Sequence, residues 1–118
     1  SQADIFSARK AVLDIHMAPA VEEYIIQLIV GTREPDHYDS ELAGWLEYGA
    51  SPRATIALDR CARANAWIAG RDYVSPDDVQ AVALDCLRHR LIVSFEAEAA
   101  GVSSDQIIGR LIERIPVA

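Results

Sequence analysis

The sequence holds only two cysteines among its 118 residues, Cys61 and Cys86. A disulfide framework or a zinc site would need more ligands at closer spacing. Both cysteines fall among apolar neighbours in stretches that we expect to be helical, so we interpret them as small buried side chains. This cysteine usage fits a reducing compartment, and we expect a cytoplasmic protein.

A long apolar run and a basic cluster are also missing. No apolar run approaches the ~20 residues that a membrane-spanning helix needs. The net charge is −7, from 11 basic and 18 acidic residues. Residues 1–50 carry three basic residues against nine acids, and residues 51–118 carry eight against nine. Because nucleic-acid-binding modules are usually basic, we expect no nucleic-acid partner. Because no apolar run is long enough, we also expect no membrane span.

The motifs of a self-contained active site are absent as well. There is no Gly-x-x-x-x-Gly-Lys-[Ser/Thr] phosphate-binding loop and no Gly-x-Ser-x-Gly nucleophile elbow. The carboxylates are scattered without a recognisable acid/base spacing. His16, His37 and His89 each lack the companions that a metal site requires. We therefore expect no complete catalytic site, no metal and no cofactor bound by this chain alone.

The sequence does contain a series of amphipathic helical patterns. Its composition, 51% hydrophobic and 25% charged, is typical of a globular protein, and its length suits one domain. Apolar residues recur at helical spacing in five main stretches. The expected helices cover residues 4–14, 19–30, 52–69, 76–91 and 103–115, with short helical turns at 40–46 and 95–100. The expected fold class is therefore all-α, a small bundle of about five helices.

Several expected helix ends have a clear signal. Gly31 is expected to end the second helix. Ser75-Pro76 is a typical start, followed by acidic residues in the first turn. Ser103 is followed three residues later by Gln106, which is a capping-box pattern. The helix over 52–69 is apolar around most of its circumference, which predicts a central helix contacted on several sides.

Two parts of the chain do not follow a helical pattern. Residues 32–49 are acidic and turn-rich, and a connection of this length in a small domain is often functional or mobile. We expect its aromatic residues Tyr38, Trp45 and Tyr48 to pin it to the core. Residues 91–93 look extended, and a short strand pair with residues 15–17 is the expected partner arrangement.

The most informative stretch opens the central helix and reads Gly49-Ala50-Ser51-Pro52-Arg53-Ala54. Ser51 is a typical N-cap, and Pro52 suits the first helical position. Arg53 then places a cation where the helix dipole favours anions. A basic side chain beside free N–H groups indicates an anion from outside, such as a phosphate. The plainer alternative is an arginine that pairs with a nearby carboxylate or faces water.

Two more arginines follow on the same helix. At about 100° per residue, Arg60 falls within roughly 20° of Arg53 on the helix wheel, and Arg63 lies about 80° away. One side of the helix is therefore expected to carry three arginines. The alternative is a solvated or ion-paired face that involves Asp59.

Three ordered blocks of the sequence stand out, GASPRAT at 49–55, GRDYVSPDDV at 70–79 and VALDCLRHRL at 82–91. Together with the tail over 96–117, they resemble the C-terminal lid of MoxR-type AAA+ ATPases. The resemblance spans most of residues 5–117 and is weakest over 32–48. It implies a helical lid over residues 1–118 that follows a P-loop ATPase core in a longer protein. A start at Ser1-Gln2, without an initiator methionine, agrees with such a fragment.

The resemblance also implies a nucleotide role. In AAA+ proteins a lid arginine called sensor 2 reaches towards the γ-phosphate of ATP, which is bound with Mg²⁺ in the full-length protein. Arg53 matches that position, and Ser51 and Pro52 form the same helix start. The Walker motifs, sensor 1 and the arginine finger would lie in the upstream P-loop core. An arginine at the sensor 2 position stabilises the phosphate charge in ATP binding or phosphoryl transfer.

The expected role of the parent protein follows from the same resemblance. It implies a ring-forming homo-oligomer that remodels or matures other complexes in a chaperone-like way, often with a von Willebrand A-type partner or client. The alternative is a helical protein-interaction domain whose arginines form structural pairs and have no nucleotide role. A nucleic-acid-binding module is a third alternative, which the charge of −7 disfavours.

Overall fold

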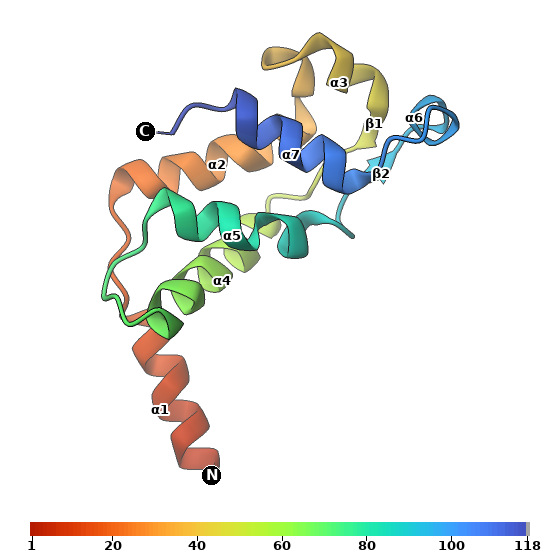
Figure 1. The fold of residues 1–118 in the computed structure, drawn as a ribbon. Helices are drawn as coiled ribbons and strands as arrows, with labels where there is room; N and C mark the ends of the chain where they lie inside the picture. The colour runs from red at the N-terminus through yellow and green to blue at the C-terminus, as the bar shows by residue number, and fades with distance from the viewer. Residues whose placement is uncertain (118) are drawn as a thin grey trace.

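The computed structural model describes residues 1–117, and Figure 1 shows their fold as a helical bundle. The longer helices are α1 (Gln2–Leu13), α2 (Pro19–Arg33), α4 (Ala54–Ile68), α5 (Pro76–Leu87) and α7 (Ser104–Arg114). The shorter elements are the 3-10 turn η1 (Pro35–His37), α3 (Ser40–Trp45), β1 (Leu46–Tyr48), β2 (Ile92–Val93) and α6 (Phe95–Ala99). The all-α prediction is confirmed, and the five longer helices are those that the apolar spacing predicts.

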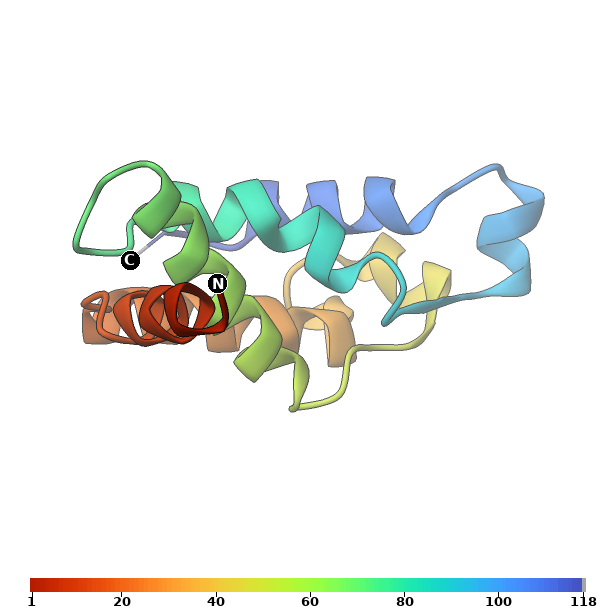
Figure 2. The ribbon, with the colours of Figure 1, turned by 90° about the horizontal axis from the view of Figure 1, so that it is seen from below.

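The central helix of the bundle is α4, which packs against α1, α2 and α5. Its buried residues are Ala54, Leu58, Ala62 and Ala66, spaced four apart along one stripe. Three of the four are alanines, so neighbouring helices approach α4 closely. Figure 2 shows α5 and α7 on one side of the bundle and α1 and α2 on the other, with α4 crossing between them. The prediction of a helix contacted on several sides is confirmed.

The predicted strand pair exists, but its predicted partners are wrong. β2 pairs antiparallel with β1, with Leu46 opposite Val93. The short helix α3 returns the chain to this position. Ser94 then fastens the pair, because its amide donates to the Trp45 carbonyl at 2.8 Å and its hydroxyl to the Gly44 carbonyl at 2.7 Å.

The segment 15–17 has a different partner, the link between α4 and α5. His16 forms an isolated parallel bridge with Tyr73. The His16 amide donates to the Asp72 carbonyl, and the Val74 amide donates to the His16 carbonyl, each at 2.9 Å. Both extended segments were thus recognised from the sequence, but which segments meet depends on how the helices pack.

Gly31 does not end α2, as the sequence predicted, because the helix continues to Arg33. Gly31 is buried, and a Cβ there would lie 2.9 Å from Ile115 Cδ1 and 3.2 Å from Leu111 Cδ2. The glycine therefore lets α7 approach α2. The helix ends where Pro35 follows the C-cap residue, which disfavours a further helical turn.

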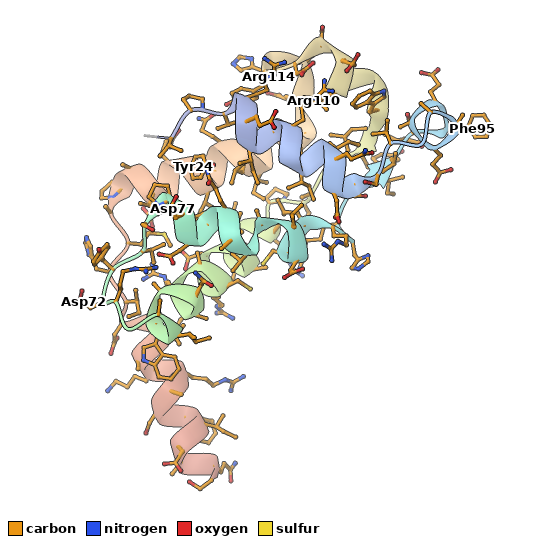
Figure 3. The ribbon with its side chains drawn as sticks, in the orientation of Figure 1. Tyr24, Asp72, Asp77, Phe95, Arg110 and Arg114 are labelled. Carbon is orange, nitrogen blue, oxygen red and sulfur yellow. The ribbon has the colours of Figure 1, made fainter. Side chains whose placement is uncertain are left out.

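The connection between α2 and α4 is held by α7. Asp39 accepts from Arg110 at 3.3 Å and lies 3.4 Å from Arg114, two side chains that Figure 3 shows on α7 beside α3. Desolvation raises the pKa of Asp39, but the Glu41 amide and Arg110 outweigh it and hold the pKa below its ordinary 3.8.

The aromatic residues of this connection behave unequally. Trp45 packs against the core. The Arg110 guanidinium carbon lies over the Trp45 ring, 5.0 Å from the ring centre. The Tyr38 hydroxyl donates to the Gln27 side chain. The predicted anchoring is therefore confirmed for these two residues. It is wrong for Tyr48, which is 64% exposed because it lies on a two-stranded sheet at the edge of the bundle.

The two cysteines are free thiols, and the prediction that both are buried is wrong. Cys61 is exposed on α4, and Cys86 on α5 is half-buried. The buried stripe of α4 passes through Ala62 and leaves Cys61 on the outer side. Burial of the Cys86 thiol, together with its contact with the Cys61 thiol, raises the pKa of Cys86 to about 12.

The first helix stands out from the body of the bundle, as Figure 1 shows. No residue of α1 is buried. Ile5, Phe6 and Leu13 are each more than half exposed on it. Its start is well formed, because Ser1 and Asp4 make a capping box. In residues 1–117, no helix is both long and apolar enough to cross a membrane.

Candidate functional site

Arg53 lies at the N-terminal end of α4, in the N-cap position, with its side chain exposed. The side-chain ion pairs of residues 1–117 use five other arginines, Arg63, Arg71, Arg88, Arg110 and Arg114. Within the part of the chain that the structure describes, Arg53 therefore has no carboxylate partner. Its guanidinium is available to an anion that comes from outside the chain.

The predicted N-cap role of Ser51 and the predicted first helical position of Pro52 are both wrong, because α4 begins at Ala54. The N-cap residue is Arg53, and no side-chain hydrogen bond caps the helix. The amides of the first turn are bonded to carbonyls of the same turn, Ala54 to Ser51 at 2.9 Å and Thr55 to Pro52 at 3.1 Å. Because these amides are already paired, they form no anion pocket, and the case for an external anion depends on the Arg53 guanidinium.

The loop that carries Arg53 is fastened to the end of α2. Ala50 is fully buried, and its amide donates to Thr32 Oγ1 at 3.0 Å. The Thr32 hydroxyl in turn donates to the Ile29 carbonyl at 2.7 Å, and Thr32 is only 1% exposed. Arg33 Nη1 donates to the Ala50 carbonyl at 3.3 Å. Both backbone polar groups of Ala50 are thus held by the last turn of α2.

Gly49 allows this close approach. A Cβ at Gly49 would lie 2.1 Å from the Thr32 carbonyl oxygen and 2.7 Å from the Arg33 amide nitrogen. No other amino acid fits there without a backbone shift. Gly49 is therefore needed for a direct contact between two backbone segments.

Thr32 and Arg33 are residues that the sequence reasoning missed. They were assigned to an irregular connection because Gly31 was interpreted as the end of α2. The signal that would have found Thr32 is its position, four residues after Leu28 on the apolar stripe of α2. A hydroxyl on a buried stripe needs hydrogen-bond partners, which predicts a backbone segment beside it.

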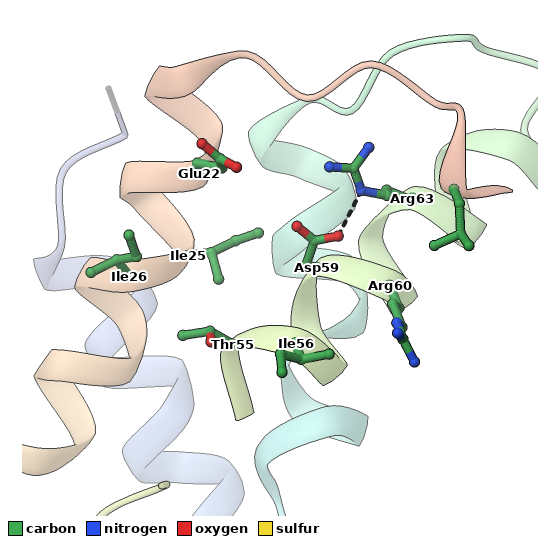
Figure 4. Close-up of a pocket in the computed structure, with 9 residues that line it drawn as sticks. Glu22, Ile25, Ile26, Thr55, Ile56, Asp59, Arg60 and Arg63 are labelled. Atoms are coloured by element: carbon green, nitrogen blue, oxygen red, sulfur yellow. Dashed lines mark hydrogen bonds and ion pairs between the residues drawn. The ribbon is translucent and has the colours of Figure 1, made fainter. Parts of the chain in front are cut away.

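The expected face with three arginines is divided. Arg60 and Arg63 line a cleft of about 490 Å³ between α1, α2 and α4, and Arg53 does not. Figure 4 shows the pair that Arg63 forms with Asp59, 2.6 Å from Nε to Oδ1. Arg63 also donates to the Ile15 carbonyl. The alternative of an ion-paired face that involves Asp59 is therefore confirmed for Arg63.

The opposite end of α4 is joined to α5 through a buried carboxylate. Asp78 is 1% exposed and accepts from Asn65 Nδ2 at 2.8 Å, from the Ser75 amide at 2.8 Å and from the Arg71 guanidinium. Desolvation raises the pKa of Asp78, but these donors outweigh it and hold the pKa below its ordinary 3.8. Arg71 and Asp78, both in the block at 70–79, therefore form a structural ion pair.

The site is suited to bind a ligand through charge, and it does not present a set of reactive groups. Over residues 1–117, no three His, Cys, Asp or Glu side chains gather in a way that would hold a metal ion. A single free guanidinium on an anchored backbone can bind and orient an anionic oxygen. The arrangement therefore suits a recognition residue that completes a site formed elsewhere.

Comparisons with known proteins identify the family to which the chain belongs. The AAA lid domain family matches residues 43–111, which is more than half of the chain, and the chain therefore belongs to this family. The crystal structure of a candidate ATPase from Cytophaga hutchinsonii is 41% identical and superposes with a TM-score of 0.88, over 92% of this chain and 33% of that one.

Two curated relatives define the type of lid. Chaperone MoxR1 of Mycobacterium tuberculosis is 32% identical over 98% of this chain and 31% of its own length. Protein MoxR of Methylorubrum extorquens is 32% identical over 86% of this chain and 32% of its own length. The domain is thus a lid of the MoxR type of AAA+ ATPase. The chain spans about a third of the length of the curated relatives that it matches.

Proposed function

We propose that residues 1–118 are the lid of a longer MoxR-type AAA+ ATPase and that Arg53 is its sensor 2 residue. The observation that carries the proposal is the exposed Arg53 guanidinium, which has no carboxylate partner among residues 1–117 and stands on a loop anchored to α2. The resemblance to MoxR-type lids supports the same position. Ser51 and Pro52 contribute their carbonyls to the turn that orients Arg53.

The residues present fit an anionic ligand held from one side. When bound, ATP supplies the phosphoanhydride bond that is hydrolysed, and Mg²⁺ neutralises part of the phosphate charge. Arg53 would bind and orient the γ-phosphate oxygens, and its fixed charge stabilises the negative charge of the transferring group. We expect the Mg²⁺ ligands, the Walker motifs and the water-activating residue to come from the P-loop core.

The test is Arg53→Ala in the ATPase that contains this lid. Loss of one preorganised donor to the reacting group lowers kcat by about 100-fold in comparable sites. We therefore expect a fall of that order in steady-state ATP hydrolysis. Because the side chain is exposed, thermal unfolding should be unchanged.

The matched control is Arg60→Ala. Arg60 is also exposed on α4 but lies roughly 10 Å further along the helix, at a rise of 1.5 Å per residue. This variant should hydrolyse ATP at the wild-type rate. Wild-type turnover and nucleotide affinity in Arg53→Ala would remove the sensor assignment and favour the alternative, a helical interaction domain with no nucleotide role.

The proposal extends to the assembly in which the lid works. We expect a cytoplasmic homo-oligomeric ring that remodels or matures a client complex, with a von Willebrand A-type protein as partner. The exposed apolar side chains of α1, Ile5, Phe6 and Leu13, are suited to cover or be covered by another domain. The acidic net charge continues to disfavour a nucleic-acid partner.

A further inference from the structure

We propose that Thr32 and Arg33 are positioning residues that hold Arg53 in place through Ala50. This inference rests on the proposed function of Arg53 and adds the device that fixes its location. Neither residue would touch the nucleotide. They would act on the backbone three residues before Arg53.

Ala50 is held in place by its backbone bonds and by its burial. Its amide and carbonyl are held by Thr32 Oγ1 and Arg33 Nη1 at 3.0 Å and 3.3 Å. Its side chain is fully buried. On its other side, Gly49 lies directly against the Thr32 carbonyl, where a Cβ would be 2.1 Å away. The loop is therefore fixed by polar bonds and by steric contact on the same two residues of α2.

The Thr32 hydroxyl is an oriented and buried acceptor for the Ala50 amide. It donates to the Ile29 carbonyl at 2.7 Å, which orients an oxygen lone pair towards the Ala50 amide. The hydroxyl is buried, so water does not compete for the bond. Loss of this hydroxyl would leave the Ala50 amide buried without an acceptor, and the loop would have to shift to satisfy it.

The loop that contains Ala50 leads directly into the turn that carries Arg53. The carbonyl of Ser51 accepts from the Ala54 amide at 2.9 Å, so the turn that contains Arg53 is continuous with both Ala50 and the first turn of α4. A displacement of Ala50 therefore moves the Arg53 backbone. Because a misplacement of about 1 Å can cost on the order of 100-fold in rate, a small shift is enough to matter.

The experiment uses Thr32→Val, Thr32→Ser and Arg33→Met in the intact ATPase, with kcat and KM for ATP as readouts. Thr32→Val should lower kcat by about ten- to 100-fold, and Thr32→Ser should restore it because the hydroxyl returns. Arg33 is exposed, so Arg33→Met should still fold. This variant should lower kcat by about two- to tenfold. Hydrogen exchange at the Ala50 amide should be fast in Thr32→Val and slow in Thr32→Ser.

The control is Ser94→Ala, which matches Thr32 in bonding but not in place. The Ser94 hydroxyl also accepts from one amide, Ala97 at 3.1 Å, and donates to one carbonyl, Gly44 at 2.7 Å. A general loss of stability would lower turnover in both variants. We expect Ser94→Ala to keep the wild-type kcat at a temperature where both proteins are folded.

A double variant separates this inference from the proposed function. If Thr32 acts only through Arg53, Thr32→Val with Arg53→Ala should have the kcat of Arg53→Ala alone. A further, multiplicative loss would overturn the positioning role. Reduced turnover in Arg53→Ala but wild-type kcat in both Thr32→Val and Arg33→Met would overturn the inference and leave the proposed function intact. Wild-type turnover in Arg53→Ala would overturn both.

Discussion

The dipeptide Ser-Pro stands at the start of α5 and just before the start of α4, and the structure completes the two helix starts in different ways. At α5, the amide and hydroxyl of Ser75 both donate to the buried carboxylate of Asp78, at 2.8 Å and 3.1 Å. At α4, no side chain caps the helix, which begins only at Ala54. The first start is closed by its own residues, and the second is held from outside by α2.

The difference comes from the residue three positions after the serine. Asp78 stands at that position in α5 and returns a carboxylate to Ser75, which completes a capping box. Ala54 stands at the equivalent position in α4 and has nothing to return. Ser-Pro alone therefore does not specify a cap. The start without a carboxylate is the one whose arginine remains free for another partner.

The largest effect is expected from Asp78→Ala, which breaks the closed start. Removal of the carboxylate leaves the Arg71 guanidinium, the Asn65 amide group and the Ser75 amide without their shared acceptor. Loss of one member of such a buried polar network costs about 3 kcal/mol in free energy of unfolding. Urea unfolding of purified protein measures it.

Two variants control for this result. Asp77→Ala removes an exposed neighbouring acid and should change the free energy of unfolding by less than about 0.5 kcal/mol. In Asp78→Asn the pH dependence should change. The pKa of Asp78 in the folded protein lies below 3.8. The carboxylate therefore contributes to the free energy of unfolding above pH 3.8, and this contribution is lost as the pH falls towards the folded pKa. Parallel acid limbs for wild type and Asp78→Asn would contradict this.

An intermediate effect is expected from Gly49→Ala, which tests the start that is held from outside. The new methyl group would meet the Thr32 carbonyl, so the loop or the end of α2 must shift, at a cost of about 2 kcal/mol. Gly109→Ala is the matched control. Nothing lies within 4 Å of a Cβ at Gly109, and α7 should gain about 0.5 kcal/mol or more in stability. Equal effects of the two changes would show that the loop is not anchored.

The smallest effect is expected when each of the two serines, Ser75 and Ser51, is replaced by alanine. Ser75→Ala removes a hydroxyl that bonds Asp78 and should cost about 1 kcal/mol in free energy of unfolding. Ser51→Ala removes a hydroxyl with no capping role and should stay within about 0.5 kcal/mol of wild type. Thermal or urea unfolding of the pair decides. A loss at Ser51 as large as that at Ser75 would show that the two starts are alike.

Local patterns predicted the helices well, because helix positions depend mainly on apolar spacing along the chain. The capping pair Ser103 and Gln106 forms as expected, with the Ser103 amide 2.8 Å from Gln106 Oε1. Features that need two distant segments were predicted less well. Gly31 was interpreted as a stop because its contact with Ile115, the C-cap residue of α7, is not visible in the local sequence.

The candidate site divides along the same line. The sequence and the family resemblance singled out Arg53, whose exposure and lack of an ion-pair partner within residues 1–117 the structure then revealed. Thr32, which holds the loop, could not be found by motif because its partner Ala50 lies 18 residues away. Cys61 was misplaced because an alanine-rich helix gives little indication of which face is outermost.

The exposed first helix has a consequence for the local stability of the chain. A helix of 12 residues is near the lower limit for a stable isolated helix, and no residue of α1 is fully buried. Its amide protons should therefore exchange through local fraying, at a free energy well below that of global unfolding, whereas those of α4 should exchange only when the bundle opens. Any surface that covers Ile5, Phe6 and Leu13 would slow this exchange. Exchange rates in α1 would therefore report whether another surface covers these side chains.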